Sequence, residues 1–321
     1  MPETLLETIS LSKSFTIRRG FFGNQHLRLR AVDRVSLSIA IGETLGLVGE
    51  SGCGKTTLGL TIMRLYEPTS GSILFEGEDF AKVSGDNLSK ARRKMQMIFQ
   101  DPFASLDPRM TVEEILKEPL NIHNVGTNEE RNDEVDRLLK VTGMPSDAAI
   151  RYPSEFSGGQ QQRIGIARAL ALQPKLLICD EPVSALDVSV QAQILNLLRD
   201  LQDQFELTYL FISHNIAVTA FMSKRIGVMY LGQLVEIGPS KEVVRTPRHP
   251  YTVELLKAVP EPEPKLKRTE HHLLGDVPSP IDRPSGCPFH PRCPLAQAIC
   301  AEEEPKLREV APDQFAACHF A

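Results

Sequence analysis

Residues 49–56 combine residue types and spacing that can bind a phosphate. Their sequence, Gly-Glu-Ser-Gly-Cys-Gly-Lys-Thr, fits the P-loop pattern G-x-x-x-x-G-K-S/T. Glycines let the backbone curl so that successive N–H groups face one phosphate, and the helix N-terminus that follows adds positive potential. We expect Lys55 to reach the β- and γ-phosphates of a nucleotide and the Thr56 hydroxyl to bind Mg²⁺. The residues expected to contact this nucleotide are Gly49, Glu50, Ser51, Gly52, Cys53, Gly54, Lys55, Thr56 and Thr57.

Two adjacent carboxylates, Asp180 and Glu181, follow the apolar run at residues 176–179. Asp180 is a candidate to hold Mg²⁺, directly or through water. Glu181 would then be placed to polarise the attacking water as a general base. A solvated strand end is the alternative interpretation, and the P-loop in the same chain disfavours it.

A second candidate for phosphate binding is the sequence Ser157-Gly158-Gly159-Gln160, which opens a predicted helix. The N–H groups of a helix start can bind an anion as a P-loop does. One nucleotide does not need two such sites in one chain, so this motif is expected to serve a nucleotide held by another chain. A helix cap without a ligand is the alternative.

Single polar residues at further strand ends complete the set of candidates. Gln100 follows the apolar residues 97–99 and could sense both Mg²⁺ and the γ-phosphate. His214 follows residues 210–213 and could contact the γ-phosphate. Asp187 ends a short loop after the acidic pair and is a candidate contact of the nucleotide. Taken alone, each is more commonly a solvated surface residue. The predicted catalytic residues are Glu181, His214 and Gln100, and the predicted Mg²⁺ ligands are Thr56, Gln100 and Asp180.

The elements that must position these residues alternate between strand and helix. Apolar runs predict buried strands, and apolar residues at helical spacing predict helices. The expected strands are 44–48, 176–179 and 209–212, and the expected helices are 56–65, 160–172 and 190–201. Strands buried on both faces that alternate with helices indicate an α/β fold with a mainly parallel sheet. Period-two alternation near residues 35–41 predicts that the first 48 residues are rich in β-structure.

The chain is expected to carry an inserted helical subdomain and a C-terminal extension. Residues 87–157 are charged and rich in helix formers, with helices expected at 112–120 and 128–141. Fourteen of the 23 prolines lie from Pro239 onward, and the run 260–264 has the composition of a linker. We therefore predict a nucleotide-binding domain at 1–240 and an extension at 241–321.

The composition limits the functions that need to be considered. Hydrophobic residues make up 41% and charged residues 24% of the 321 residues, which is ordinary for a soluble globular protein. A net charge of −5 gives no electrostatic support for nucleic-acid binding. We find neither a signal peptide nor an apolar stretch of about 18 residues, and we expect a cytosolic location without membrane spans.

The order of the motifs resembles the nucleotide-binding domain of ABC transporters, a P-loop NTPase fold. In that family the Walker A motif, Q-loop, signature, Walker B motif, D-loop and H-loop follow one another as 49–56, Gln100, 157–160, 180–181, 184–187 and His214 do here. The resemblance implies a head-to-tail dimer in which each ATP lies between one P-loop and the partner's signature. It also places Phe15 where the family has an aromatic residue that stacks on adenine. Gln161 and Asn215 depart from common family residues, and neither change removes a phosphate or metal ligand.

The C-terminal part of the sequence resembles the oligopeptide/dipeptide branch of importer ATPases, and most closely its F-type second ATPase. Residues 248–256 and 277–287 carry this resemblance. It implies a peripheral protein on the cytoplasmic face of the membrane, with a second ATPase subunit, two permease subunits and, indirectly, a solute-binding protein as partners. The cargo and the choice between a copy and a paralogue as second ATPase stay open. The alternative is a soluble ABC-type ATPase that acts as a mechanical switch without a permease.

Four of the six cysteines lie near the C-terminus, in the expected metal-cluster segment 284–321. Cys287, Cys293, Cys300 and Cys318 lack the C-x₂₋₄-C pairs that are usual for structural zinc, whereas iron–sulfur clusters accept varied spacing. The resemblance implies a [4Fe–4S] cluster held by these four thiols, with a structural role. Zinc, disulfides and free thiols remain the alternatives.

Overall fold

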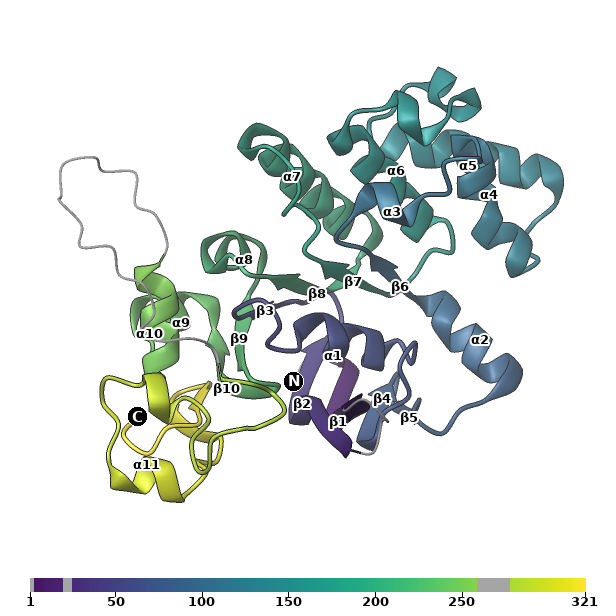
Figure 1. Cartoon of the computed structure of the whole chain (residues 1–321). Coiled ribbons are helices and arrows are strands. Elements are labelled where there is room, and N and C mark those ends of the chain that lie inside the picture. The colour runs from purple at the N-terminus through teal and green to yellow at the C-terminus, as the bar shows by residue number, and fades with distance from the viewer. Residues whose placement is uncertain (1–2, 20–24, 259–277) are drawn as a thin grey trace, which may run out of the picture. The chain divides into compact units, whose positions relative to one another are not determined.

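The computed structural model describes residues 3–19, 25–258 and 278–321 (Figure 1). The chain divides into two compact units. The first consists of Met1–Leu5, Ala40–Glu43 and Lys82–Ile212, and the second of Leu6–Ile39, Thr44–Ala81 and Ser213–Ala321. The linker-like run 260–264 and Val277 lie outside the described residues. In the described part of the chain, no helix combines the length and the apolar character needed to cross a membrane.

The first unit is built on three parallel strands, β6 (Met95–Ile98), β7 (Leu176–Asp180) and β8 (Thr208–Ser213). Met95 pairs with Leu176, and Asp180 pairs with Ile212. Every residue of β7 and β8 is buried, as expected for parallel strands that are covered on both faces. The predicted α/β fold with buried parallel strands is confirmed.

Helices make up the rest of the first unit. They are α2 (Gly85–Lys94), α3 (Pro102–Ser105), α4 (Val112–Ile122), α5 (Asn128–Val141), α6 (Gly158–Leu170) and α7 (Val188–Phe205), with 3₁₀ turns η1 (Ser146–Ile150) and η2 (Pro153–Glu155). Three of these helices begin with a capping box, in which a Thr or Ser side chain and a Glu or Gln three residues later bond each other's backbone N–H. The boxes pair Thr111 with Glu114, Thr127 with Glu130, and Ser157 with Gln160.

The second unit begins with an antiparallel sheet in the order β2-β1-β4-β5. Its strands are β1 (Thr4–Arg19), β2 (Gln25–Ala40), β4 (Ser70–Phe75) and β5 (Glu78–Asp79). Leu6 pairs with Phe75, and a register shift lies between Ile9 and Ser12. The prediction that the first 48 residues are rich in β-structure is confirmed.

The same unit contains β3 (Thr44–Val48), β9 (Arg225–Tyr230), β10 (Gln233–Pro239), β12 (Gln314–Ala316) and β11 (Arg308–Ala311), which are neighbours in that order. β3 and β9 are parallel, and the other pairs are antiparallel. Because Glu236 pairs with Ala316, the end of the chain continues the sheet beyond β10. Helices α1 (Lys55–Ile62), α8 (Ile216–Met222), α9 (Ser240–Arg245), α10 (Pro250–Lys257) and α11 (Ala298–Glu302), and the turn η3 (His290–Arg292), complete the unit.

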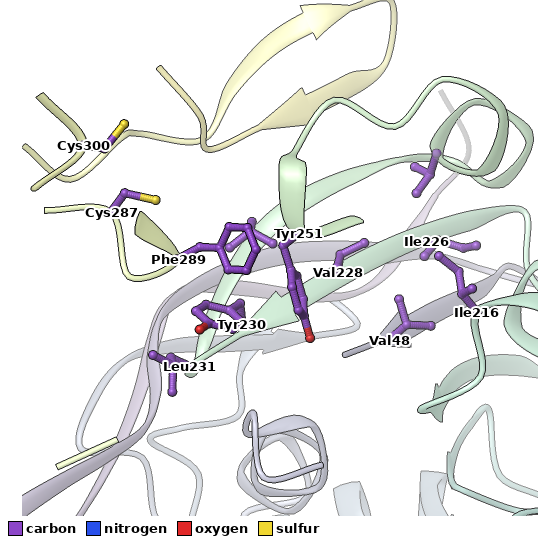
Figure 2. Packing of buried hydrophobic residues seen from close by; sticks show 12 residues of the cluster. Val48, Ile216, Ile226, Val228, Tyr230, Leu231, Tyr251, Cys287, Phe289 and Cys300 are labelled. Carbon is purple, nitrogen blue, oxygen red and sulfur yellow. The ribbon is translucent and has the colours of Figure 1, made fainter. Parts of the chain in front are cut away.

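One buried cluster joins the C-terminal extension to the strand that precedes the P-loop (Figure 2). Val48 of β3 and Val228 of β9 belong to it, together with Tyr251 of α10 and Phe289. The Phe289 ring lies 5.4 Å from the ring of Tyr251, centroid to centroid. The segment after residue 284 therefore contributes the side chains of Cys287, Phe289 and Cys300 to the core of this unit.

Candidate active site

The P-loop joins β3 to α1 and approaches its surroundings closely. A Cβ at Gly54, whose φ is +108°, would lie 2.1 Å from the carbonyl oxygen of Ala31. A Cβ at Gly49 would lie 2.2 Å from the carbonyl oxygen of Met229. Glycine is required at both positions because backbone atoms cannot move aside as a flexible side chain can. The strand–turn–helix context predicted for the motif is present.

Lys55 lies folded against its own loop. Its side chain is buried, and its ammonium donates to the carbonyl oxygens of Gly49 (2.7 Å) and Glu50 (3.1 Å). Burial raises the pKa of the neighbouring Cys53 thiol, so this cysteine is not a thiolate at neutral pH. An ammonium that donates to loop carbonyls can transfer these hydrogen bonds to phosphate oxygens, which are stronger acceptors because they are charged. Thr56, the predicted Mg²⁺ ligand, is the second residue of α1 and is exposed.

Phe15 belongs to a small aromatic group. Its ring meets the ring of Tyr66 edge to face, with centroids 5.2 Å apart, and Lys13 Nζ lies 4.9 Å from the Phe15 centroid. Tyr66 and Lys13 are residues that sequence reasoning missed. Tyr66 directly follows the apolar pattern of α1, but nothing in the sequence indicates that it meets Phe15. Both rings are partly exposed and offer a surface on which a planar base can stack.

The first unit brings Gln100 and Glu181 together. Gln100 Nε2 donates to Glu181 Oε2 over 3.3 Å. Glu181 has a positive φ of 46°, and its backbone N–H donates to the carbonyl oxygen of Ile212 at 2.9 Å. A non-glycine residue rarely adopts this conformation, which is stabilised here by the end of β8 and directs the carboxylate toward Gln100. Asp180, the last residue of β7, is buried beside it.

The predicted second phosphate-facing motif caps its own helix. Ser157 Oγ accepts from the N–H of Gln160 over 3.4 Å, and Gln160 Oε1 accepts from the N–H of Ser157 over 3.0 Å. Ser157, Gly158 and Gln160 are exposed. The Ser157 hydroxyl can accept this bond and still donate its own proton to an anion. A capped and solvent-exposed helix start therefore remains able to bind a phosphate oxygen.

The remaining predicted site residues lie at the starts of helices. His214 follows β8 and is exposed, and the next residue, Asn215, caps α8 by accepting from the N–H groups of Ala217 and Val218. Asp187 is the exposed N-cap residue of α7, and its carbonyl oxygen accepts from the N–H of Gln191. Phe15, residues 49–57 and His214 lie in the second unit, whereas the other predicted nucleotide and magnesium residues lie in the first.

The four C-terminal cysteines line one cavity. Its walls also carry ring and aliphatic side chains: His249, Phe289, His290, Leu295, His319 and Phe320. Burial raises the pKa of Cys287 to about 11, and its neighbouring thiols add to the increase. All four are free cysteines. Within the described ranges, no three His, Cys, Asp or Glu side chains are placed to hold a single metal ion. Four cysteine thiols that line one cavity match the number and type of ligands that iron–sulfur clusters use.

Comparison with known families identifies two regions of the chain. The family described as "ABC transporter" matches residues 32–184. The family described as "Oligopeptide/dipeptide transporter, C-terminal region" matches residues 235–300. The first region contains the P-loop, Gln100, the Ser157 motif and the acidic pair, and the second contains three of the four cysteines that line the cavity.

Similarity to curated proteins extends over nearly the whole chain. The oligopeptide transport ATP-binding protein AppF of Bacillus subtilis is 54% identical over 99% of this chain and 98% of its own length. A putative peptide import ATP-binding protein of Brucella ovis is 51% identical over the same shares of both chains. The putative oligopeptide transport ATP-binding protein YkfD of Bacillus subtilis is 52% identical over 95% of this chain and 93% of its own length.

Solved structures of ATP-binding cassettes superpose on about three-quarters of the chain. The ATP-binding cassette MJ0796, solved as a dimer in a post-hydrolysis state with ADP and Pi, superposes with a TM-score of 0.65 at 30% identity, covering 74% of this chain and 99% of that one. The protein cbiO1 of Clostridium perfringens, part of the ABC transporter complex cbiONQ, has a TM-score of 0.64 at 27% identity, covering 75% of this chain and 90% of that one.

Proposed function

The chain belongs to the ABC transporter family of ATPases, and on that premise we propose that it hydrolyses ATP to drive the import of peptides. The observation that carries the peptide class is the C-terminal region, residues 235–300, which matches the oligopeptide/dipeptide transporter family. The full-length similarity to AppF, at 54% identity, supports the same class. A soluble switch without a permease is not favoured, because such a protein has no need of this extension.

We propose the following roles within one nucleotide site. Lys55 would bind the β- and γ-phosphates, and Thr56, Gln100 and Asp180 would hold Mg²⁺. Glu181 would polarise the attacking water, and Gln100, whose Nε2 donates to the Glu181 carboxylate, would orient that carboxylate. His214 contacts the γ-phosphate, and Phe15 with Tyr66 stacks on the adenine.

The exposed signature supports a shared site between two chains. Ser157 and Gln160 cap their helix and remain exposed to solvent. We propose that they bind the γ-phosphate of an ATP held by the partner's P-loop, and the dimeric state of MJ0796 supports this arrangement. The partner is a copy of this chain or a paralogue. Two permease subunits on the cytoplasmic face of the membrane and, indirectly, a solute-binding protein complete the importer.

We propose that the four C-terminal cysteines hold a [4Fe–4S] cluster. Cys287, Cys293, Cys300 and Cys318 would each supply one thiolate, and they line the same cavity. When bound, the cluster supplies cross-links between segments of the extension and takes no part in phosphoryl transfer, which needs no electrons. Protein purified without air should contain about four iron and four sulfide per chain. Stoichiometric zinc without sulfide would contradict the cluster.

The Glu181→Gln variant tests the ATPase assignment. Gln keeps the shape of the side chain but cannot act as a base, so hydrolysis should fall by a factor of roughly 10²–10⁴ while ATP still binds. Glu129→Gln, an exposed residue in the first turn of α5, is the matched control and should retain full activity. A normal rate of ATP hydrolysis in the Glu181→Gln variant would contradict the assignment of Glu181 as the general base.

The peptide class is tested by transport in cells that carry the permease partners. Uptake of a labelled tetrapeptide should require this chain and should stop in the Glu181→Gln variant, while the Glu129→Gln control takes up the peptide normally. Uptake of a free labelled amino acid through other carriers should be the same in all strains. Peptide uptake that persists at the normal rate with Glu181→Gln would contradict the proposed function.

A further inference from the structure

The second residue of the P-loop, Glu50, bonds two residues of the C-terminal extension and the lysine of its own loop. The Glu50 carboxylate accepts two hydrogen bonds from the guanidinium of Arg292, with Nη1–Oε2 at 2.8 Å and Nη2–Oε1 at 2.9 Å. The Glu50 N–H donates to the hydroxyl oxygen of Tyr251 at 2.8 Å. Its carbonyl oxygen accepts from the ammonium of Lys55 at 3.1 Å. Glu50 therefore links Lys55, the predicted phosphate-binding lysine, to two residues of the C-terminal extension.

Arg292 is the more deeply buried partner of this ion pair. Its side chain is only 4% exposed, against 21% for Glu50, and its Nη1 also lies 3.4 Å from the Tyr230 hydroxyl. Hydrogen bonding to the Glu50 carboxylate is the main cause of the raised pKa of Arg292. The guanidinium is therefore always charged. A buried bidentate pair fixes both partners in position and orientation, because two parallel hydrogen bonds must form together.

The backbone around Arg292 belongs to the cysteine segment. Arg292 ends the turn η3 and is followed directly by Cys293. The N–H of His290 donates to the carbonyl oxygen of Cys287 at 3.0 Å, so the turn starts at one cavity-lining cysteine and ends at another. Phe289, the residue before this turn, packs against the ring of Tyr230 (Figure 2). The two ring centroids are 5.3 Å apart.

We propose that Arg292 is a positioning residue for nucleotide binding, which holds the P-loop through Glu50 and makes its geometry depend on the cysteine turn. The proposal rests on the proposed function, since it assumes that the P-loop binds ATP. Two physical effects act together. The pair fixes the position of Glu50 and thereby the resting position of Lys55, and the guanidinium neutralises a carboxylate that would otherwise repel a polyanionic ligand. The sequence predicts a structural role for the cysteine segment, and this contact adds a second role.

The first experiment compares ATP affinity in Arg292→Met and in a matched control. Arg283→Met removes another arginine of the extension, whose side chain is 13% exposed and which pairs with Asp33 and not with the P-loop. By calorimetric titration of the full chain, Arg292→Met should weaken ATP binding by about tenfold to a hundredfold, with kcat at saturating ATP within about twofold of the wild type. Arg283→Met should lower the unfolding midpoint but leave ATP affinity unchanged. An ATP affinity in Arg292→Met equal to that of the control overturns the proposal.

A second variant separates positioning from general loss of structure. In Arg292→Met with Glu50→Gln, the unpaired carboxylate is gone, so ATP affinity should recover at least partly relative to Arg292→Met. A purely structural role predicts no recovery, and that outcome overturns the proposal. If Arg292→Met does not fold, Arg292→Lys replaces it. Lysine keeps the charge but not the bidentate geometry, and should weaken binding by several-fold.

The link to the cysteine turn is tested by combining substitutions. Cys293→Ser should weaken ATP binding by several-fold in the wild-type background and have no further effect in the Arg292→Met background, because the effect passes through the arginine. Equal effects in both backgrounds overturn the link. The proposed function fails separately, and visibly, if the wild-type chain itself does not bind ATP in the same titration.

Discussion

The chain contains two glycine-rich helix starts that are expected to meet phosphates, and they are held in different ways. At the start of α6, the side chains of Ser157 and Gln160 each accept a hydrogen bond from the other residue's backbone N–H. At the start of α1, the preceding residue is Gly54, which has no side chain to form a cap. The P-loop is instead held by distant segments: Tyr251 and Arg292 bond to Glu50, and the N–H of Gly232 donates to the carbonyl oxygen of Cys53 at 2.7 Å.

The two motifs differ in which residues can change their geometry. A locally capped helix start keeps its geometry as long as its own few residues are intact. A loop held by contacts from far along the chain changes when any of those contacts changes. The P-loop is therefore open to influence from the C-terminal extension, whereas the Ser157 motif is capped by its own residues and packs closely against Val190 of α7.

The largest effect is expected for Lys55→Ala. Hydrogen bonds from a charged donor contribute about 1.5–3 kcal/mol each, so losing those that Lys55 makes to the phosphates should weaken ATP binding on the order of a hundredfold. Lys241→Ala, an exposed lysine of α9 in the same unit, is the control and should bind ATP normally. Equilibrium titration measures both. Equal ATP affinities of Lys55→Ala and Lys241→Ala would contradict the assignment of the P-loop to the nucleotide site.

The next effect concerns the two glycines after Ser157. A Cβ at Gly159 would lie 2.4 Å from Val190 Cγ1 of α7, whereas a Cβ at Gly158 would lie 3.4 Å from Leu186 Cδ2. Gly159→Ala should therefore destabilise the protein by about 1–3 kcal/mol through overpacking. Gly158→Ala should be neutral or stabilising by up to about 1 kcal/mol.

Urea unfolding distinguishes the two glycine variants. Adding Val190→Ala to Gly159→Ala removes the clashing methyl and should restore most of the lost stability, because the two positions share one contact. The same loss for Gly158→Ala and Gly159→Ala, or no rescue by Val190→Ala, would show that close packing between α6 and α7 does not set the geometry of the motif.

The third effect uses pH to weaken the support of the P-loop. His249 caps α10, the helix that carries Tyr251, by accepting from the Tyr251 N–H at 3.1 Å. Burial lowers the pKa of His249 to about 3, from 6.5. Between these values the unfolded chain binds a proton that the folded protein does not, so folding stability falls as the pH falls. At pH 5 the loss should reach about 2 kcal/mol relative to pH 7.

The matched variant for this pH effect is His249→Asn, which keeps an acceptor for the cap but does not titrate. Its unfolding free energy should lose about 2 kcal/mol less between pH 7 and pH 5 than that of the wild type. The carboxylate of Glu236 accepts the backbone N–H of His249, so Glu236→Gln in the same background checks that Glu236 is not the titrating group. An identical pH dependence in wild type and His249→Asn would contradict the assignment.

The smallest effect is expected for Ser157→Ala. Loss of an N-cap side chain costs about 1 kcal/mol, and Ser157→Gly should cost only a few tenths. ATP affinity of the isolated chain should stay within about twofold of the wild type in both, because the motif serves the nucleotide of the other chain, while ATPase activity of the assembled dimer falls. A loss of ATP affinity in the isolated Ser157→Ala chain would place the motif at its own nucleotide instead.

Much of the fold could be predicted from the sequence because the signals are local. The buried strands at 176–179 and 209–212 appear as β7 and β8 with one further residue at one or both ends. The helix expected at 128–141 has the same bounds in the structure, where its capping box defines the start. The helix expected at 56–65 is shorter and ends at Ile62. Met63 is its C-cap residue, and a turn separates it from Pro68.

The extension could not be predicted in the same way. Its proline content suggested a separate segment, yet β12 pairs with β10, and Phe289 packs against Tyr230 and Tyr251. The partners of Glu50 lie 201 and 242 residues away in the sequence. Nothing in the local pattern around Arg292 distinguishes it from an exposed arginine, because a single charged residue becomes buried only when its partner is supplied from elsewhere.

By itself the sequence determined the chemistry of this protein: a glycine-rich loop with Lys55, an acidic pair after a buried strand, and a serine cap at a second helix start. These follow from residue type and short spacing, which act through backbone geometry that is the same in any fold. Only the tertiary structure decided that Glu181 meets Gln100, that four cysteines surround one cavity, and that Arg292 holds the P-loop. Such contacts join residues that are distant in sequence. They depend on the burial of many other side chains at once, and no local pattern encodes that.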